Sequence, residues 1–377
     1  MTAFQSRGWI LAGLFIALSV FLPLSSDGPS FGVASALVCL AGAAFIAAGL
    51  ARWPAGPWLL AVAMLLILAA AALTLISHEA SVSGNAQLGF WLKASGLWLA
   101  AWMTVDMVAN ARTGPTSSRR TFSSTVQDLT PPLLFGLTLL ILWEWLVAGF
   151  GIPAINLLAP SAIGVALSQF ADTLAQDFVW TFLHEALLGW LIGSGAGFAM
   201  ALVADRIPFL RRGLLPLGNV VSALPIVGIA PIMIWWFTYD WPSKTAVVIA
   251  MTFFPMLVNT VAGLSASGDL ERDLMRSYGA SYWSTLTRLR LPAAMPFVFN
   301  GLKINSTLAM IGAIVAEYLD GPTIGMGFRI NTQAALSHTD IVWAEIAVSM
   351  VAGSVFYGII ALVERMVTFW HPSYRRA

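Results

Sequence analysis

Charged side chains are scarce in this chain of 377 residues, and they gather in one stretch. Of the 37 charged residues (19 Lys and Arg plus 18 Asp and Glu), seven lie between positions 265 and 292: Asp269, Glu271, Arg272, Asp273, Arg276, Arg288 and Arg290. Asp269 with Arg272, and Asp273 with Arg276, are opposite charges at a spacing that stabilises a helix. The chemistry that these residues offer is surface contact, either with membrane headgroups or with a cytoplasmic partner protein.

The first half of the stretch predicts a short amphipathic helix. Asp269 is suited to cap its N-terminus. Leu270, Leu274 and Tyr278 recur every four residues and form one apolar stripe. Gly279 then suits a left-handed C-terminal cap. A second short helix is expected over 280–290, ended by a proline that also fits the first turn of a following helix.

Residue patterns for catalysis are absent from the sequence. A P-loop needs a Gly-Lys-Ser/Thr triplet, and none of the three lysines, Lys93, Lys244 and Lys303, follows a glycine. The four histidines are far apart, so no local pair of metal ligands exists. We therefore predict that the chain is not an enzyme and binds no metal or cofactor of its own.

The amino-acid composition indicates what kind of structural elements hold the polar stretch in place. The chain is 58% hydrophobic and 10% charged, against about 25% charged in a soluble domain. A membrane-spanning helix needs about 20 mainly apolar residues. We expect an all-α polytopic membrane protein with about ten spans, at 8–24, 31–51, 56–76, 88–109, 131–150, 185–205, 214–238 (broken by its prolines), 244–264, 293–316 and 343–365.

Arginine and lysine in the loops predict the orientation, because cytoplasmic loops are enriched in them. With the N-terminus inside, most basic loop residues fall on the cytoplasmic side. Both termini and the 265–292 loop are then cytoplasmic. The net charge of +1 and the lack of a basic block give no sign of a nucleic-acid partner. The second half of the long segment 151–183 is expected to lie as an amphipathic helix at the outer surface.

The polar basic segment 113–130 divides the chain into regions. We predict a four-helix membrane extension at 1–112, a cytoplasmic linker at 113–130, and a six-helix core at 131–377. Within the core, Gly189, Gly193 and Gly197 repeat at every fourth position. Such a ridge lets a neighbouring helix approach closely.

The 265–292 loop resembles the conserved cytoplasmic loop of binding-protein-dependent ABC importer permeases of the type I class. The family pattern is Glu-Ala-Ala, three residues, Gly, nine residues, Ile, one residue, Leu-Pro. Its positions here are Asp273, Leu274, Met275, Gly279, Leu289, Leu291 and Pro292. Asp273 replaces the glutamate, and Leu274 and Met275 replace the two alanines. Flanking segments, such as "LPIVGIAPIMIWWF" and "FFPMLVNTVAGL", are similar to the nitrate, sulfonate and taurine branch.

The resemblance implies a function and a set of partners. The loop would be the coupling helix that inserts into a separate cytoplasmic ABC ATPase, which holds the ATP and Mg²⁺. A periplasmic or lipoprotein substrate-binding protein would deliver the solute. The permease would work as a pair, expected to be a homodimer, surrounded by lipid in a bacterial inner membrane. Small solutes such as sulfonates, taurine or nitrate are the expected cargo.

Polar residues within the spans are candidates for the solute path, since charges there usually face a protein interior or a cavity. Asn259, Lys303 and Glu317 are the candidates, although structural roles are the more common reason for such residues. The alternative function is a secondary transporter driven by an ion gradient. It explains the buried charges but not the spacing of the loop.

Overall fold

The computed structural model describes residues 11–16, 18, 84, 86–110, 122–222, 225–237, 240–319 and 324–369. Every regular element within these ranges is a helix, which confirms the all-α fold class. The spans expected at 31–51 and 56–76, and most of the one at 8–24, lie outside the described residues. The chain divides into two compact units, Met1–Gly164 and Val165–Ala377, and each is described by itself.

In the first unit, helices α5 (Leu88–Asn110) and α6 (Phe122–Phe150) pack against each other. They correspond to the spans expected at 88–109 and 131–150. Helix α6 starts earlier than expected, so the second half of the segment 113–130 is helical. The domain division proposed from the sequence stays a prediction.

An acidic side chain of α6 is satisfied by the start of the next helix, α7 (Pro160–Gln169). The buried carboxylate of Glu144 accepts hydrogen bonds from the Ser161 backbone N–H (2.9 Å) and hydroxyl (2.5 Å). The positive end of a helix dipole favours such an acid. Glu144 therefore has a structural role in this unit.

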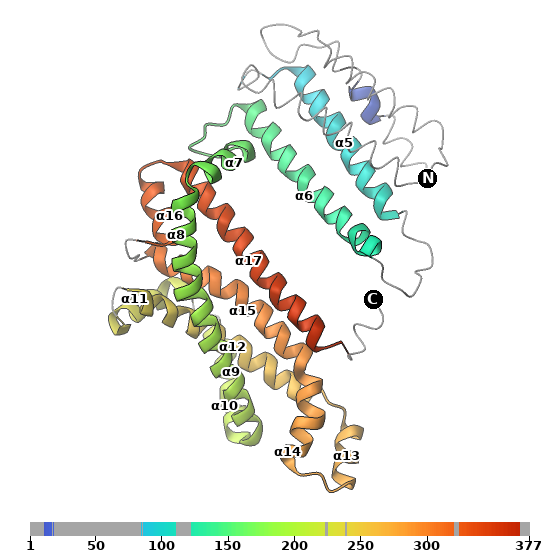
Figure 1. Cartoon of the computed structure of the whole chain (residues 1–377), viewed down its shortest axis with the longest axis vertical. Coiled ribbons are helices and arrows are strands. Elements are labelled where there is room, and N and C mark those ends of the chain that lie inside the picture. Colours follow the sequence, from blue (N-terminus) through green and yellow to red (C-terminus); the bar gives the residue numbers. More distant parts are fainter. Residues whose placement is uncertain are drawn as a thin grey trace. The chain divides into compact units, whose positions relative to one another are not determined.

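The second unit is a bundle of long helices with short ones between them (Figure 1). In chain order its elements are α8 (Ala171–Val179), the π-helix η1 (Trp180–Leu187), α9 (Leu188–Arg206), α10 (Pro208–Ser222), α11 (Ile226–Phe237), α12 (Trp241–Ser265), α13 (Asp269–Ser277), α14 (Tyr282–Thr285), the π-helix η2 (Leu286–Arg290), α15 (Leu291–Leu319), α16 (Met326–Ala335) and α17 (Thr339–Val367).

Four helices in the described ranges are long and apolar enough to cross a membrane: Ala171–Arg206, Trp241–Ser265, Tyr282–Leu319 and Thr339–Val367. They contain the spans expected at 185–205, 244–264, 293–316 and 343–365. Shorter apolar helices are Phe135–Phe150 and Gly228–Phe237. These helices confirm a polytopic membrane protein, while the total of ten spans stays a prediction.

The prediction of a separate surface helix before the 185–205 span was wrong. Helices α8, η1 and α9 form one continuous helix from Ala171 to Arg206. Asp177 has the polarity of a surface residue, but it is fully buried and pairs with Arg329, whose Nε lies 2.7 Å from its carboxylate. A distant partner thus explains the polar residue that the sequence pattern assigned to a surface.

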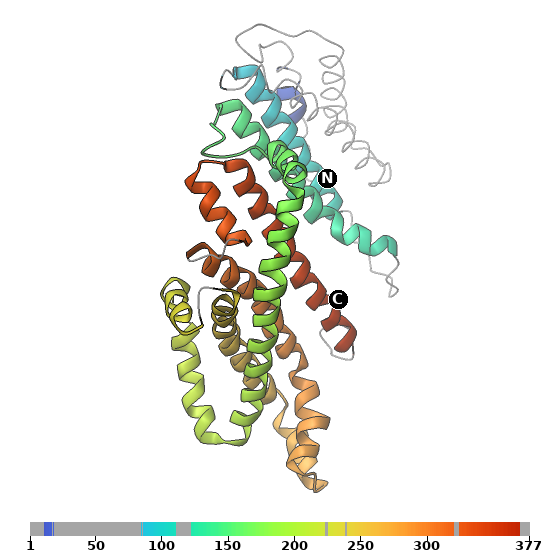
Figure 2. The same ribbon diagram turned by 60° about the vertical axis from the view of Figure 1, so that its left-hand side comes forward.

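The run 214–238 is broken as expected. Helix α10 ends at Ser222 and α11 begins at Ile226, with Pro225 just before it. A proline disfavours helical backbone at the residue that precedes it. Helix α10 runs antiparallel to α9 after a tight reversal at Ile207 (Figure 2).

The core of the second unit is centred on α12, which packs against both α9 and α15. The glycine ridge of α9 faces α12, as expected. A Cβ at Gly189 would lie 2.6 Å from Val248, and a Cβ at Gly193 would overlap the Thr252 hydroxyl and lie 2.8 Å from the Ile249 carbonyl. The absence of side chains on the ridge therefore sets how closely α9 and α12 approach.

Candidate functional site

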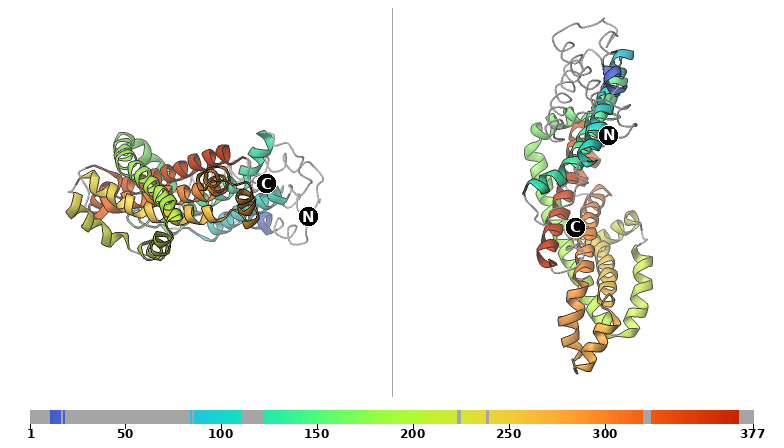
Figure 3. Two further views of the ribbon diagram at one scale, coloured as in Figure 1. Left: turned by 90° about the horizontal axis from the view of Figure 1, so that it is seen from below. Right: turned by 90° about the vertical axis from the view of Figure 1, so that its right-hand side faces the viewer.

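The 265–292 loop projects from one end of the second unit in every side view (Figures 1 and 2; Figure 3, right). Its first helix, α13, contains no buried residue. Leu270 is 83% exposed, Leu274 55% and Tyr278 80%, so the predicted apolar stripe faces outward. A short helix with an uncovered apolar face is suited to contact with another surface. We call Leu270, Leu274 and Tyr278 the apolar stripe of α13.

The N-terminus of α13 differs from the expectation. Gly268 occupies the cap position with φ −63° and ψ 155°, and Asp269 is the first helical residue. No side chain caps this end by a hydrogen bond. Asp269 and Glu271 instead lie in the first turn, where acidic side chains interact favourably with the helix dipole.

The C-terminus of α13 closes as predicted. Gly279 has φ +66°, the left-handed conformation. Its N–H donates to the carbonyl of Arg276 (2.9 Å), and the Ala280 N–H donates to the carbonyl of Met275 (3.0 Å). Nothing lies within 4 Å of a Cβ placed on Gly279, so only backbone conformation requires glycine there.

Replacing Gly279 by Val is therefore expected to loosen this turn without a steric clash. A β-branched residue in the left-handed region costs about 1–2 kcal/mol. Limited trypsin cleavage at Arg276 and Arg288 should accelerate about 5- to 30-fold, since opening of the loop becomes easier by that energy. Gly279→Asn is the control, because asparagine tolerates this conformation; equal cleavage of both variants and the wild type would contradict the assignment.

Hydrogen bonds from the side chain of Arg272 attach α13 to the end of α12 and the segment that follows it. Arg272 donates from Nε to the Ser267 hydroxyl (2.8 Å) and from a terminal nitrogen to the Ser265 carbonyl (2.9 Å). On the exposed side, Arg276 and Asp273 form an ion pair of 3.0 Å, with side chains 79% and 67% exposed. Such an exposed pair stabilises little, so Asp273 and Arg276 remain available to a partner.

The second half of the loop is not a separate helix. Helices α14 and η2 continue into α15, so that Tyr282–Leu319 is one helix. Pro292 lies in the first turn of α15, as expected, but it does not end the helix before it. The wider π-helical turn of η2 comes just before this proline, whose ring excludes the ordinary helical hydrogen bond. Leu286 packs with Leu264 and Ala294, which anchors the segment.

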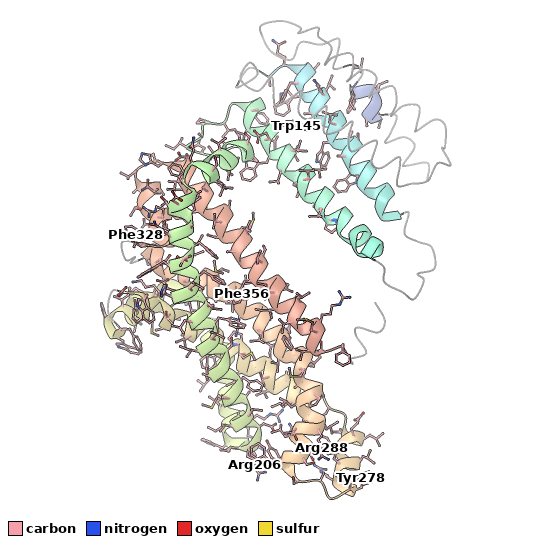
Figure 4. All side chains as sticks on the ribbon, viewed as in Figure 1. Trp145, Arg206, Tyr278, Arg288, Phe328 and Phe356 are labelled. Carbon is pink, nitrogen blue, oxygen red and sulfur yellow. The ribbon has the colours of Figure 1, made fainter. Side chains whose placement is uncertain are left out.

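The residues of the family pattern therefore fall into two groups. Asp273, Leu274 and Gly279 are exposed, and Met275 is half-buried. Leu289, Leu291 and Pro292 are half-buried on the helix that leads into the bundle. The first group can contact a partner, and the second connects α13 to α15. Figure 4 shows Tyr278 and Arg288 at this end, near Arg206 at the end of α9.

An ion pair that sequence reasoning missed lies at the base of the loop. Arg290 donates from both terminal nitrogens to the carboxylate of Asp205, at 2.6 and 2.7 Å. The Tyr282 hydroxyl donates to the same carboxylate at 2.9 Å. In the sequence, Asp205 appears only as an acid beside Arg206 at the end of a span, and no pattern marks it as the partner of Arg290.

The three candidates for a solute path lie in different surroundings. Asn259 accepts a hydrogen bond from the exposed Asn300 (3.0 Å), linking α12 to α15. Lys303 forms an ion pair of 2.7 Å with Glu364 of α17. Glu317 is fully buried, and it lies 14 residues (317 − 303) from Lys303 on α15, about 21 Å along the helix. The structure therefore separates Lys303 from Glu317.

Glu317 belongs to a buried polar network at the opposite end of the bundle. It accepts from the Thr181 hydroxyl (2.8 Å) and from the Gly327 N–H (2.7 Å). Beside it, Asp177 accepts from the Gly325 N–H (2.9 Å) and from Arg329. The hydrogen bond with Asp177 raises the pKa of Arg329 above its usual value. This network holds the start of α16, a helix that the sequence patterns did not predict.

Within the part of the chain that the structure describes, no group of three or more His, Cys, Asp or Glu side chains could hold a metal ion. The exposed feature of the 265–292 loop is the apolar stripe of α13. A continuous helix then connects this loop to the core.

Comparison with known proteins agrees with this arrangement. Residues 193–369 match the family described as binding-protein-dependent transport system inner membrane component. The riboflavin transport system permease protein of Chloroflexus aurantiacus is 29% identical over 242 residues, 62% of this chain and 88% of that protein. The putative aliphatic sulfonates transport permease protein of Bacillus subtilis is 26% identical over 246 residues, 64% of this chain and 88% of that protein.

A shorter match connects the chain to the taurine transport system permease protein of Escherichia coli, which is 30% identical over 182 residues, 48% of this chain and 64% of that protein. The matched family segment begins within α9 and ends just after α17, so it contains the 265–292 loop and the central helix α12. Residues 193–369 are thus similar to the inner membrane components of binding-protein-dependent transport systems, and the relatives that this chain resembles over about two thirds of its length are transport permeases.

Proposed function

We propose that this chain is the transmembrane permease subunit of an ATP-driven ABC importer and is coupled to a separate ATPase through the 265–292 loop. The observation that carries the proposal is the exposed apolar stripe of α13, a helix that Arg272 attaches to the end of α12. The sequence has no P-loop of its own, so the energy of ATP hydrolysis must come from another subunit.

The proposed cycle has two states that ATP binding biases. Two ATPase subunits close on ATP and move the α13 helices of two permease copies, expected to be identical. The permease pair then opens toward a periplasmic or lipoprotein substrate-binding protein and accepts the solute. Hydrolysis returns the pair to the inward-facing state. In this proposal both termini and the 265–292 loop are cytoplasmic, and lipid of a bacterial inner membrane surrounds the helices.

Asn259 with Asn300 is the best-supported part of the proposed solute path. An exposed asparagine within a membrane helix is costly beside lipid and is satisfied beside water or protein. Lys303 and Glu317 stay as weaker candidates, since each is held by contacts within the bundle: an ion pair for Lys303 and a hydrogen-bond network for Glu317.

The proposed cargo is a small solute. Relatives are named for riboflavin, for aliphatic sulfonates, for taurine and for nitrate. We propose a solute of this size, such as a sulfonate, taurine or nitrate, with the binding protein setting most of the specificity.

Uptake in cells tests the proposal against a secondary transporter. Labelled taurine, nitrate and riboflavin serve as probes, and uptake that requires this chain is measured. We expect uptake to continue in the presence of an uncoupler and to stop when the partner ATPase carries an inactive P-loop lysine. Uptake that stops with the uncoupler and is unchanged by the ATPase variant would establish an ion-gradient transporter instead.

A further inference from the structure

The base of the 265–292 loop contains a nearly buried ion pair. The side chain of Asp205, at the end of α9, is 2% exposed, and that of Arg290, in η2, is 13% exposed. The pair is bidentate, with nitrogen–oxygen distances of 2.6 and 2.7 Å. This planar geometry fixes the relative orientation of two segments, which a single contact would not do.

Further contacts attach a third helix and a second part of the loop to the same pair. The Nε of Arg290 donates to the carbonyl of Leu264 near the end of α12 (3.1 Å). The Tyr282 hydroxyl donates to Asp205, and the guanidinium of Arg206 lies 4.7 Å from the centre of the Tyr282 ring. We call Asp205, Arg206, Leu264, Tyr282 and Arg290 the junction.

The junction determines which helices follow the loop when it moves. Tyr282 and Arg290 lie on the continuous helix that ends in α15, so α15 follows the loop by its backbone alone. Helix α9 has no such backbone connection to the loop. Its ion pair with this segment is made by Asp205, 85 residues away from Arg290 in the sequence, while Arg206 contacts the Tyr282 ring and Leu202 packs against the cluster of Leu264, Leu286 and Ala294.

We infer that Asp205 is a positioning residue that makes α9 move together with the 265–292 loop and α15. The inference rests on the proposed function, in which a partner ATPase pushes or pulls α13. Because a buried hydrogen-bonded charge pair resists separation, a displacement of α13 reaches α9, α12 and α15 as one body. Without Asp205 the displacement still reaches α15 through the backbone, and less of it reaches α9.

The test compares one reporter on each helix. The chain's one cysteine, Cys39, is replaced by Ser, and a nitroxide is attached to a cysteine at Leu191 on α9 or at Ile311 on α15, which are 53% and 47% exposed. The permease–ATPase complex is studied in nanodiscs with and without ATP and vanadate. In the wild type, we expect the spectrum of both reporters to change with nucleotide.

Asp205→Asn is expected to reduce the nucleotide-dependent change at position 191 about tenfold and to keep the change at 311, because hydrogen bonds to a charged group are lost while the backbone path remains. Tyr282→Phe, which leaves the ion pair intact, should give a smaller loss and keeps the test usable if Asp205→Asn folds poorly. Arg212→Gln is the matched control, since this exposed arginine lies at the same end outside the junction.

The possible outcomes separate the inference from the proposed function. An unchanged response at 191 in Asp205→Asn, with the ATPase bound, overturns the role of Asp205. Equal loss at both positions shows that the junction only maintains the fold, which also overturns it. No ATPase bound to the wild type, or no response at either reporter in the wild type, would refute the proposed function itself.

Discussion

Leu274→Asp is expected to prevent stable binding of the partner ATPase while the permease itself folds normally. Leu274 lies in the middle of the apolar stripe and is 55% exposed, so the bundle loses little packing when the side chain changes. In a complex the same position would be covered, and an aspartate there would be a buried, unpaired charge. Loss of a central apolar anchor costs about 2 kcal/mol or more, which weakens the Kd about 30-fold.

The measurement is co-purification of the ATPase with the permease in detergent, followed by titration of the purified partners. Leu274→Met is the matched control, because it keeps the apolar character and nearly the volume of leucine. We expect its affinity to stay within a few-fold of the wild type. Wild-type affinity in Leu274→Asp would place the contact elsewhere and would remove the main support for the proposed coupling surface.

Gly193→Ala is expected to destabilise the second unit. The added Cβ would overlap the Thr252 hydroxyl and would lie 2.8 and 2.9 Å from backbone atoms of Ile249. A backbone cannot rotate away as a side chain does, so α9 and α12 must separate along the ridge. Overpacking of this kind costs about 1–3 kcal/mol.

Gly195→Ala is the control for this prediction. It lies on the same helix, and nothing is within 4 Å of its added Cβ. Alanine is favoured over glycine in a helix by up to about 1 kcal/mol, so this variant should be as stable as the wild type or more stable. Unfolding of both variants in detergent micelles gives the comparison; equal stability would mean that α9 and α12 do not pack closely through Gly193.

The two halves of the 265–292 loop differ in how far the sequence predicts them. The stripe of α13 and the left-handed turn at Gly279 were correct, because side-chain periodicity and turn chemistry act over a few residues. The cap at Asp269 and the separate helix over 280–290 were wrong. Leu286 packs against Leu264 of α12 and Ala294 of α15 within this continuous helix, and such contacts between distant residues are not contained in local preferences.

The sequence by itself determined that this is an all-α membrane protein, where most of its described long helices lie, and which loop is polar, because apolar runs of the required length need no knowledge of partners. Only the tertiary structure decided that Asp177 is buried with Arg329 and that Asp205 holds Arg290. These partners are 152 and 85 residues apart in the sequence. From sequence alone, a charged residue is assigned to the surface. Its burial becomes tolerable only when the fold brings an opposite charge to it, and that partner is not known before the tertiary structure.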